Sequence, residues 1–264
     1  MRRTAAALLA LAALAVTQPA CASGDGGLGT AATASRFRVL VFSRTTGYRH
    51  ASIPAGVATI RRLGRARGFG VDHTEDEGRF TARGLARYAA VVFLSTTGEP
   101  LAREEHRRAF RRYIERGGGF LGIHAASDSF YDWPWYAGLV GAGFRRHARG
   151  TPAADVLVED RRTAATAGLP RVWRRTDEWY AFRANPRGRV HVLATVDERS
   201  YDAHGASMGA DHPIAWCRRY DGGRSVYTAM GHTSGSYGEP SFAAHLLGAI
   251  EIAAGAAPFA CSAR

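Results

Sequence analysis

The sequence predicts an α/β fold in which helices cover both faces of one central, mostly parallel sheet. Short apolar runs alternate with amphipathic stretches of helical length, and glycine, proline and small polar residues separate them. Strands that alternate with helices in this way imply parallel βαβ crossovers and a doubly wound sheet. The chain has 264 residues, of which 46% are hydrophobic and 22% charged, so it can bury the core of one full domain.

The first half carries the clearest alternation. A strand is predicted over residues 37–43, and Pro54 stands where the following helix begins. Apolar residues then recur at helical spacing up to Gly68. The next predicted elements are strands over 69–74, 88–95 and 120–123, and an amphipathic helix over 104–116 that three glycines end.

The second half is less regular. Strands are predicted over 155–158, 190–195 and 224–229, some of them antiparallel, and a closing helix over 241–253. We expect one domain over 36–256, followed by a C-terminal tail over 257–264.

The N-terminus has the pattern of a signal peptide over residues 1–22. Arg2 and Arg3 precede an apolar run that is too short to span a membrane. Two kinds of processing fit: cleavage after Ala22, or a lipid on Cys21 followed by a flexible tether over 23–35. Either way we expect export, as an extracellular protein or a cell-surface lipoprotein.

Export favours a disulfide between Cys217 and Cys261, because an oxidising compartment promotes pairing of the two remaining cysteines. The alternative is two unrelated buried thiols.

The net charge of +12 could suggest nucleic acid as a partner. However, all basic residues are arginines and they are scattered among acids, so we expect no nucleic-acid binding.

Two histidines follow predicted strands at the point where chemistry sits in open α/β sheets. His124 comes directly after strand 120–123, and His232 comes just after strand 224–229. An imidazole can bind a metal or move a proton, but it is a poor acyl-enzyme nucleophile. We predict both as catalytic residues within roughly 10 Å of each other, bordering one cleft. Asp177 and Glu178 offer paired carboxylates and are predicted to join them.

Binding roles are predicted for residues in the surrounding loops. Aromatic residues can stack on sugar faces, while an arginine or carboxylate fixes hydroxyl groups. For the aromatic loop around Trp133, a small satellite core is an equally good interpretation. The predicted substrate-binding residues are Arg49, His50, Tyr48, Tyr180, Trp133 and Asp128.

A metal site would have to be assembled from separated loops, because no H-x-x-x-H or H-E-x-x-H spacing occurs. The candidate ligands are His124, His147 and His212. The sequence does not identify the cofactor; the hypothesis is a divalent metal such as zinc.

Five ordered motifs make the chain resemble the ThuA-like (trehalose utilisation) family over about residues 37–255. They are Thr46–Ile53, Gly122–Ala126, Asp177–Tyr180, His212–Trp216 and Gly231–Thr233. The resemblance implies the flavodoxin-like three-layer sandwich of class I glutamine amidotransferases. In that relationship His124 stands at the position of the amidotransferase cysteine and His232 at that of its partner histidine. Glutamine hydrolysis is therefore not expected.

The resemblance further implies a role in the metabolism of disaccharides or oxidised (3-keto) sugars, with a small carbohydrate as ligand. Two hypotheses remain open. The chain is either an exported carbohydrate-active enzyme, hydrolase-like or lyase-like, or a non-catalytic module that binds a carbohydrate or a partner.

Overall fold

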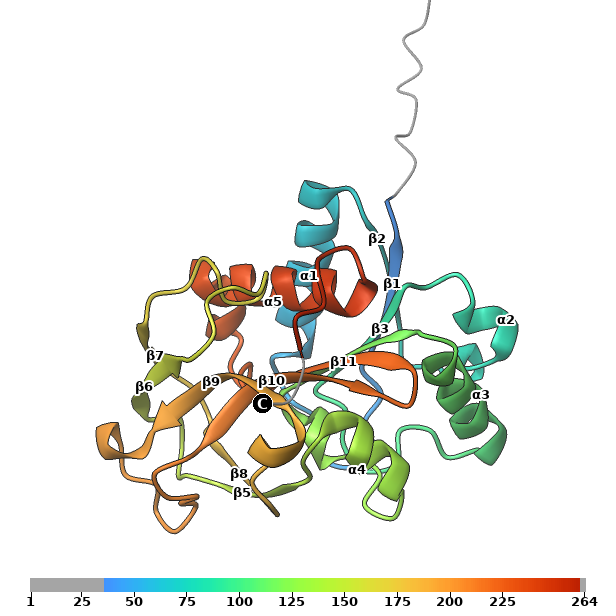
Figure 1. Ribbon diagram of the computed structural model, residues 1–264. Helices are drawn as coiled ribbons and strands as arrows, with labels where there is room; N and C mark the ends of the chain where they lie inside the picture. Colours follow the sequence, from blue (N-terminus) through green and yellow to red (C-terminus); the bar gives the residue numbers. More distant parts are fainter. Residues whose placement is uncertain (1–35, 262–264) are drawn as a thin grey trace, which may run out of the picture. The chain divides into compact units, whose positions relative to one another are not determined.

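A nine-stranded sheet forms the centre of the fold (Figure 1). The computed structural model describes residues 36–261, so the predicted signal peptide and tether lie outside the described residues. Across the sheet the strands follow the order β2-β1-β3-β4-β11-β10-β9-β6-β7. Their bounds are Arg38–Phe42 (β1), Gly70–Thr74 (β2), Ala90–Leu94 (β3), Gly119–Ile123 (β4), Ala153–Val158 (β6), Val172–Thr176 (β7), His191–Asp197 (β9), Pro213–Tyr220 (β10) and Gly223–Thr228 (β11).

Five neighbouring strands, from β2 to β11, run parallel to one another. Strands β3 and β4 are buried along their whole length, which explains why their sequences are continuous apolar runs. Because these strands are parallel, their carboxyl ends meet at one edge of the sheet. The segments that carry His50, His124 and His232 leave β1, β4 and β11 at this edge.

Strands β10, β9, β6 and β7 extend the sheet in antiparallel fashion. This part contains two predicted strands of the second half, 155–158 (β6) and 190–195 (β9), together with β7 and β10, which were not predicted. The third predicted strand, 224–229, is β11 of the parallel part. The antiparallel part ends at the β7–β8 connection, which carries the acidic pair Asp177 and Glu178.

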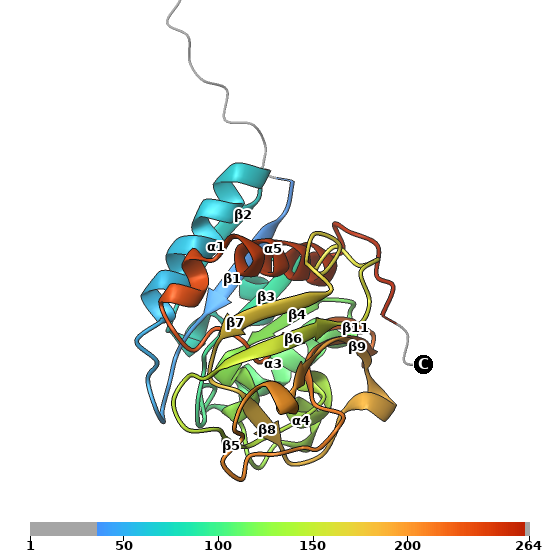
Figure 2. The ribbon, with the colours of Figure 1, turned by 90° about the vertical axis from the view of Figure 1, so that its left-hand side faces the viewer.

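Helices cover both faces of the sheet (Figure 2). Helices α1 and α5 lie on one face, while α3 and α4 lie on the other, with α2 packed beside α3. This arrangement confirms the predicted α/β fold with helices on both sides of a central parallel sheet. The helices span Ile53–Arg67 (α1), Ala82–Leu85 (α2), Glu104–Glu115 (α3), Pro134–Val140 (α4) and Pro240–Ala254 (α5).

A small two-stranded sheet lies on the α4 side of the fold (Figure 2). It pairs β5, Phe144–His147, with β8, Tyr180–Phe182, in antiparallel fashion. The pairing sets His147 opposite Tyr180, two residues beyond Glu178. The second half of the chain therefore brings its own side chains toward the loops of the parallel strands.

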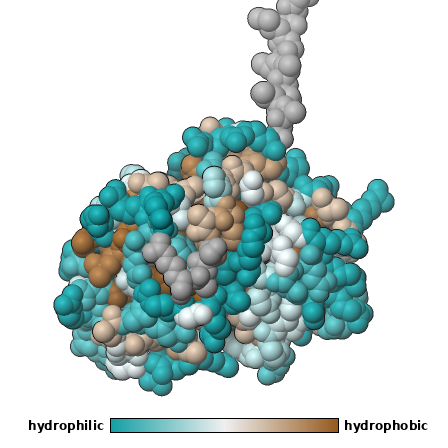
Figure 3. All heavy atoms as spheres, viewed as in Figure 1, coloured by the Kyte–Doolittle hydropathy of each residue, from teal (hydrophilic) through white to brown (hydrophobic). Residues whose placement is uncertain are grey.

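A disulfide fastens the C-terminal segment to the sheet. Cys217 of β10 and Cys261 are bonded, with their Cα atoms 5.4 Å apart, so the predicted pairing is present. Hydrophilic side chains cover most of the face drawn in Figure 3, and apolar side chains are confined to separate areas. Among the described residues, no helix is both long and apolar enough to cross a membrane.

Candidate active site

Four side chains converge at the carboxyl edge of the parallel strands. His50 lies between β1 and α1, His124 directly follows β4, and His232 follows β11. Glu178, from the connection between β7 and β8, completes the group. One potential ligand atom from each residue lies within 4.8 Å of the others. We refer to His50, His124, Glu178 and His232 as the histidine cluster.

The backbone holds His124 in an unusual conformation. Its φ angle is +51°, in the left-handed region that non-glycine residues rarely adopt. The side chain is fully buried, and its Nδ1–H donates a hydrogen bond to the carbonyl oxygen of Ala229 over 2.7 Å. That bond leaves Nε2 without a proton in the neutral ring, so a lone pair faces the cluster. A conformation of this kind at a strand end is typical of functional sites.

Three ligand atoms of the cluster form a nearly equilateral triangle. His124 Nε2 lies 3.2 Å from His232 Nδ1 and 3.4 Å from Glu178 Oε2. His232 Nδ1 lies 3.1 Å from the same carboxylate oxygen. The His50 ring stands perpendicular to those of His124 and His232, with centroids 4.7 and 5.2 Å apart. The predicted proximity of His124 and His232 is thus observed.

The charges of the cluster follow from these contacts. Burial alone would raise the pKa of Glu178, but its contacts with His124 and His232 together outweigh burial and hold that pKa well below its usual range. The hydrogen bond to Glu178 raises the pKa of His232. Burial, with the nearby His124 and His232, lowers the pKa of His50 to about 3. Near neutral pH the cluster therefore offers an ionised carboxylate and a neutral His50, both suited to a cation.

The sequence matches the family model of ThuA, described as trehalose utilisation, over residues 38–253. The chain belongs to the ThuA family. No curated protein matches it significantly.

Crystal structures with the same fold include other ThuA-like proteins. One from Bacteroides uniformis has 23% identity and a TM-score of 0.69, and the match covers 89% of this chain and 94% of the B. uniformis chain. One from Parabacteroides merdae has 20% identity and a TM-score of 0.66, and the match covers 83% of this chain and 90% of the P. merdae chain. A cytoplasmic protein from Salmonella typhimurium has 12% identity and a TM-score of 0.58, and covers 82% and 99%. At these identities the likeness is one of fold.

In this ThuA chain Asp177 takes a supporting place instead of the predicted catalytic one. The side chain is fully buried and accepts hydrogen bonds from the backbone N–H groups of Glu178, Gly231 and His232. It also forms an ion pair with the buried Arg175 over 2.7 Å. With its oxygens occupied in this way, Asp177 fixes the two segments that present Glu178 and His232.

The structure changes the predicted metal-ligand set. His212 is fully buried, and both ring nitrogens already have partners, Glu198 and the carbonyl of Tyr180, each at 2.7 Å. It is therefore not available as a ligand. His147 lies at the rim: its Nδ1 is 2.8 Å from the Ala148 carbonyl and 3.3 Å from Glu178 Oε1, outside the histidine cluster.

The group whose atoms could hold a metal ion joins His50, Glu178 and His232 to His124, in place of the predicted His147 and His212. His50 was expected to contact substrate, but its buried Nδ1 has no hydrogen-bond partner, and the ring joins the cluster. Its sequence signals were the position after the first parallel strand and its place in the Thr46–Ile53 motif. Those signals do not distinguish a ligand from a capping residue.

The other predicted binding residues divide into two groups. Tyr180 and Tyr48 contact the cluster: the buried Tyr180 ring packs on His124 at 4.4 Å, and the exposed Tyr48 ring meets His50 edge-on at 4.8 Å. Arg49 and Asp128 have other partners. Arg49 is paired with Glu75 on the surface, and Asp128 accepts a hydrogen bond from Tyr131.

Trp133 does not form the predicted sugar-binding wall. Its ring packs against Phe130, Trp135 and Tyr136, with the guanidinium of Arg107 over it. It is partly buried against the main core. For Trp133, this packing agrees with the alternative interpretation, a structural aromatic cluster, rather than a sugar-binding surface.

Proposed function

We propose that the chain is an exported enzyme that binds one divalent metal ion in the histidine cluster and acts on a small carbohydrate by hydrolysis or elimination. The observation that carries the proposal is the convergence of His124 Nε2, His232 Nδ1 and Glu178 Oε2 at separations of 3.1–3.4 Å. His50 approaches from a fourth direction.

The spacing of the donors fits a metal ion. Zinc bonds to nitrogen and oxygen of about 2.0–2.2 Å place two ligands of a tetrahedral site roughly 3.3–3.6 Å apart, close to the 3.1–3.4 Å seen here. Imidazole nitrogens with a carboxylate oxygen suit zinc and related transition metals better than calcium or magnesium. The hydrogen bond from His124 Nδ1–H to the Ala229 carbonyl is the kind of outer contact that orients a metal-binding histidine.

The cluster opens to solvent on one side, which an enzyme requires. The His232 side chain is 24% exposed, whereas that of His124 is fully buried. A divalent metal would polarise a substrate oxygen or lower the pKa of a bound water. His147 lies at the open side beside the second oxygen of Glu178 and is placed to carry a proton between site and solvent.

The carbohydrate ligand is supported by the family and by the aromatic rim. The family model is described as trehalose utilisation. Tyr48 stands exposed beside His50 and offers a flat apolar surface of the kind on which sugar rings stack. Export is supported by the N-terminal pattern and by the Cys217–Cys261 disulfide, because such bonds persist in oxidising compartments.

Turnover tests the proposal. The purified chain is incubated with a panel of disaccharides and their 3-keto derivatives, before and after removal of metal with a chelator. We expect activity that disappears with the chelator, returns with one equivalent of zinc or another transition metal, and is lost in Glu178→Gln. His204→Asn is the control, because His204 lies outside the cluster and is exposed.

Two results would contradict the proposal. Activity that persists after the metal is removed would show that no metal is needed. The cluster residues would then act by acid–base chemistry only. Sugar binding without turnover, with or without metal, would favour a non-catalytic binding module.

A further inference from the structure

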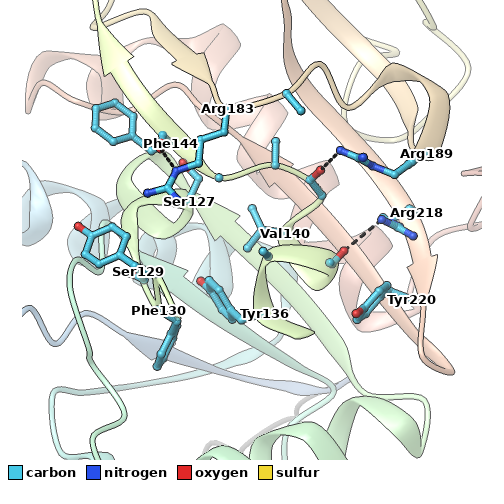
Figure 4. Close-up of a pocket in the computed structure, with 17 residues that line it drawn as sticks. Ser127, Ser129, Phe130, Tyr136, Val140, Phe144, Arg183, Arg189, Arg218 and Tyr220 are labelled. Carbon is cyan, nitrogen blue, oxygen red and sulfur yellow. Dashed lines mark hydrogen bonds between the residues drawn. The ribbon is translucent and has the colours of Figure 1, made fainter. Parts of the chain in front are cut away.

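A cavity of about 470 Å³ lies beside the histidine cluster, between α4, β10 and the β5–β8 sheet (Figure 4). None of the four cluster residues lines it. Phe144 lines the cavity and packs on Tyr180 at 4.3 Å, and Tyr180 in turn packs on His124 at 4.4 Å. One aromatic layer thus separates the cavity from the cluster. The volume is large enough for a ligand the size of a monosaccharide.

The charged groups that line this cavity are all positive. Arg183, Arg189 and Arg218 contribute guanidinium groups, and no carboxylate lines the cavity. Each arginine donates a hydrogen bond to a backbone carbonyl, those of Phe144, Gly141 and Gly138 respectively. In the part of the chain that the structure describes, none of the three has an acidic side chain within salt-bridge distance.

A neighbouring arginine on the same segment has acidic partners. Arg187, two residues before Arg189, is paired with both Glu159 and Asp211. Arg189 and Arg218 instead lie together at one end of the cavity (Figure 4). At the other end, Arg183 lies near enough to Asp128 for its charge to act on that carboxyl group. The uncompensated positive charge is therefore concentrated at the Arg189 and Arg218 end.

Arg218 also has an unused donor. Its Nε is buried and has no hydrogen-bond partner. Burying a guanidinium donor without a partner costs free energy, which an anionic ligand would offset. Burial lowers the pKa of Arg218, and the positive charge of Arg189 also lowers it. A bound anion would offset both effects.

We propose that this cavity binds a small sugar that carries a carboxylate or phosphate group, with the anionic group between Arg189 and Arg218. Guanidinium groups bind both anions through paired, charge-assisted hydrogen bonds. Ser127, Ser129 and Tyr131 also line the cavity, and we place the sugar ring beside them. The site needs no metal, so it does not depend on the proposed function.

Calorimetric titration of the metal-free chain tests the site with four probes: glucuronate, glucose 6-phosphate, inorganic phosphate and glucose. We expect binding of glucuronate, of glucose 6-phosphate, or of both, with neutral glucose at least about tenfold weaker. The comparison of the two acids identifies the anionic group. Glu178→Gln should bind as the wild type does, which separates this test from that of the metal site.

Arginine variants locate the binding. Arg218→Gln and Arg189→Gln should each weaken binding by about tenfold or more, the loss expected for one charge-assisted hydrogen bond. Arg189 is exposed, so its substitution leaves the fold intact even if Arg218→Gln does not. Arg219→Gln is the matched control, because Arg219 is exposed on the same strand and contacts Phe259.

Several results would overturn the proposal. They are failure of both sugar acids to bind, equal affinity for glucose, and affinity that Arg189→Gln leaves unchanged. Inorganic phosphate binding as tightly as the sugar acids would reduce the site to one for a free anion and would contradict the sugar part of the proposal.

Discussion

At the scale of single residues, two adjacent acids do different work. Glu178 is part of the histidine cluster, whereas Asp177 accepts hydrogen bonds from backbone N–H groups and pairs with the buried Arg175. The sequence placed both beside the chemistry but could not separate them, because the separation depends on which partners the fold supplies. The same limit applies to His212, whose two nitrogens are occupied by groups from distant parts of the chain.

Substitution of Asp177 should mainly affect stability, and substitution of Glu178 should mainly affect metal binding. Asp177→Asn leaves the buried Arg175 without one of its two carboxylate partners, so we expect the free energy of unfolding to fall by about 3 kcal/mol. Glu178→Gln should abolish metal binding with a smaller loss of stability, because the carboxylate that it removes contacts histidines and no arginine. Urea unfolding and metal titration of both variants measure this. Equal stability loss in the two would show that their roles are not distinct.

The pH dependence of metal binding should follow His232. A metal needs this ring neutral, and its contact with Glu178 raises its pKa above the ordinary value of 6.5. As the pH falls, protons should therefore begin to compete with zinc for His232 while the pH is still above 6.5. Below the raised pKa, zinc affinity should fall by about tenfold per pH unit. Zinc titrations between pH 5.5 and 8 check this.

The stability of the metal-free chain should depend on pH in the opposite direction to its zinc affinity. Because the folded-state pKa of His232 is raised, its ion pair with Glu178 stabilises the fold fully below pH 6.5 and is lost as pH rises through the raised pKa. A zinc affinity that does not change across the same range would contradict the assignment of His232 as a ligand.

At the scale of elements, the sequence predicted the five parallel strands and helices α1, α3 and α5, but not the short helices α2 and α4. The clearest strands, β3 and β4, are buried along their whole length and are therefore continuous apolar runs. Strand β7 was missed, and its composition explains why. Its inward residues are Trp173 and Arg175, and an arginine at an inward position breaks the alternation that marks a half-buried strand. Arg175 is tolerated there because Asp177 and Glu239 neutralise it.

The same reasoning explains the missed β5 and β8. Tyr180–Phe182 is only three residues long, and β5 contains Arg145, Arg146 and His147. Neither carries a periodic signal on its own. These two strands nevertheless position Phe144, Tyr180 and His147 around the cluster. Tyr180 and His147 were predicted as site residues, but the strand pairing that places them was not.

The disulfide joins β10 to the C-terminal segment and should stabilise the fold. It closes a loop with a sequence separation of 44, for which loop-closure entropy predicts a loss of roughly 3–4 kcal/mol on removal. A Cys217→Ala, Cys261→Ala double variant should therefore unfold at lower urea concentration while keeping its zinc affinity. Unchanged stability would show that the bridge does not constrain the unfolded chain.

At the scale of the whole molecule, the chain combines the α/β fold of the ThuA family with a cluster of three histidines and a glutamate at the carboxyl edge of its parallel strands. The fold class and the edge that carries the site were predictable, because they follow from strand order and chain direction. The arginine-lined cavity was not, since the lack of carboxylates around Arg189 and Arg218 appears only once the chain is folded.

Zinc titration of the metal-free protein at pH 7.5 tests the central claim most directly. We predict one equivalent bound by the wild type and by His204→Asn, and none by Glu178→Gln or by His124→Asn, in which asparagine tolerates the left-handed backbone. Wild-type protein that binds no transition metal, or cluster variants that bind it as the wild type does, would contradict the claim that these four residues form a metal site.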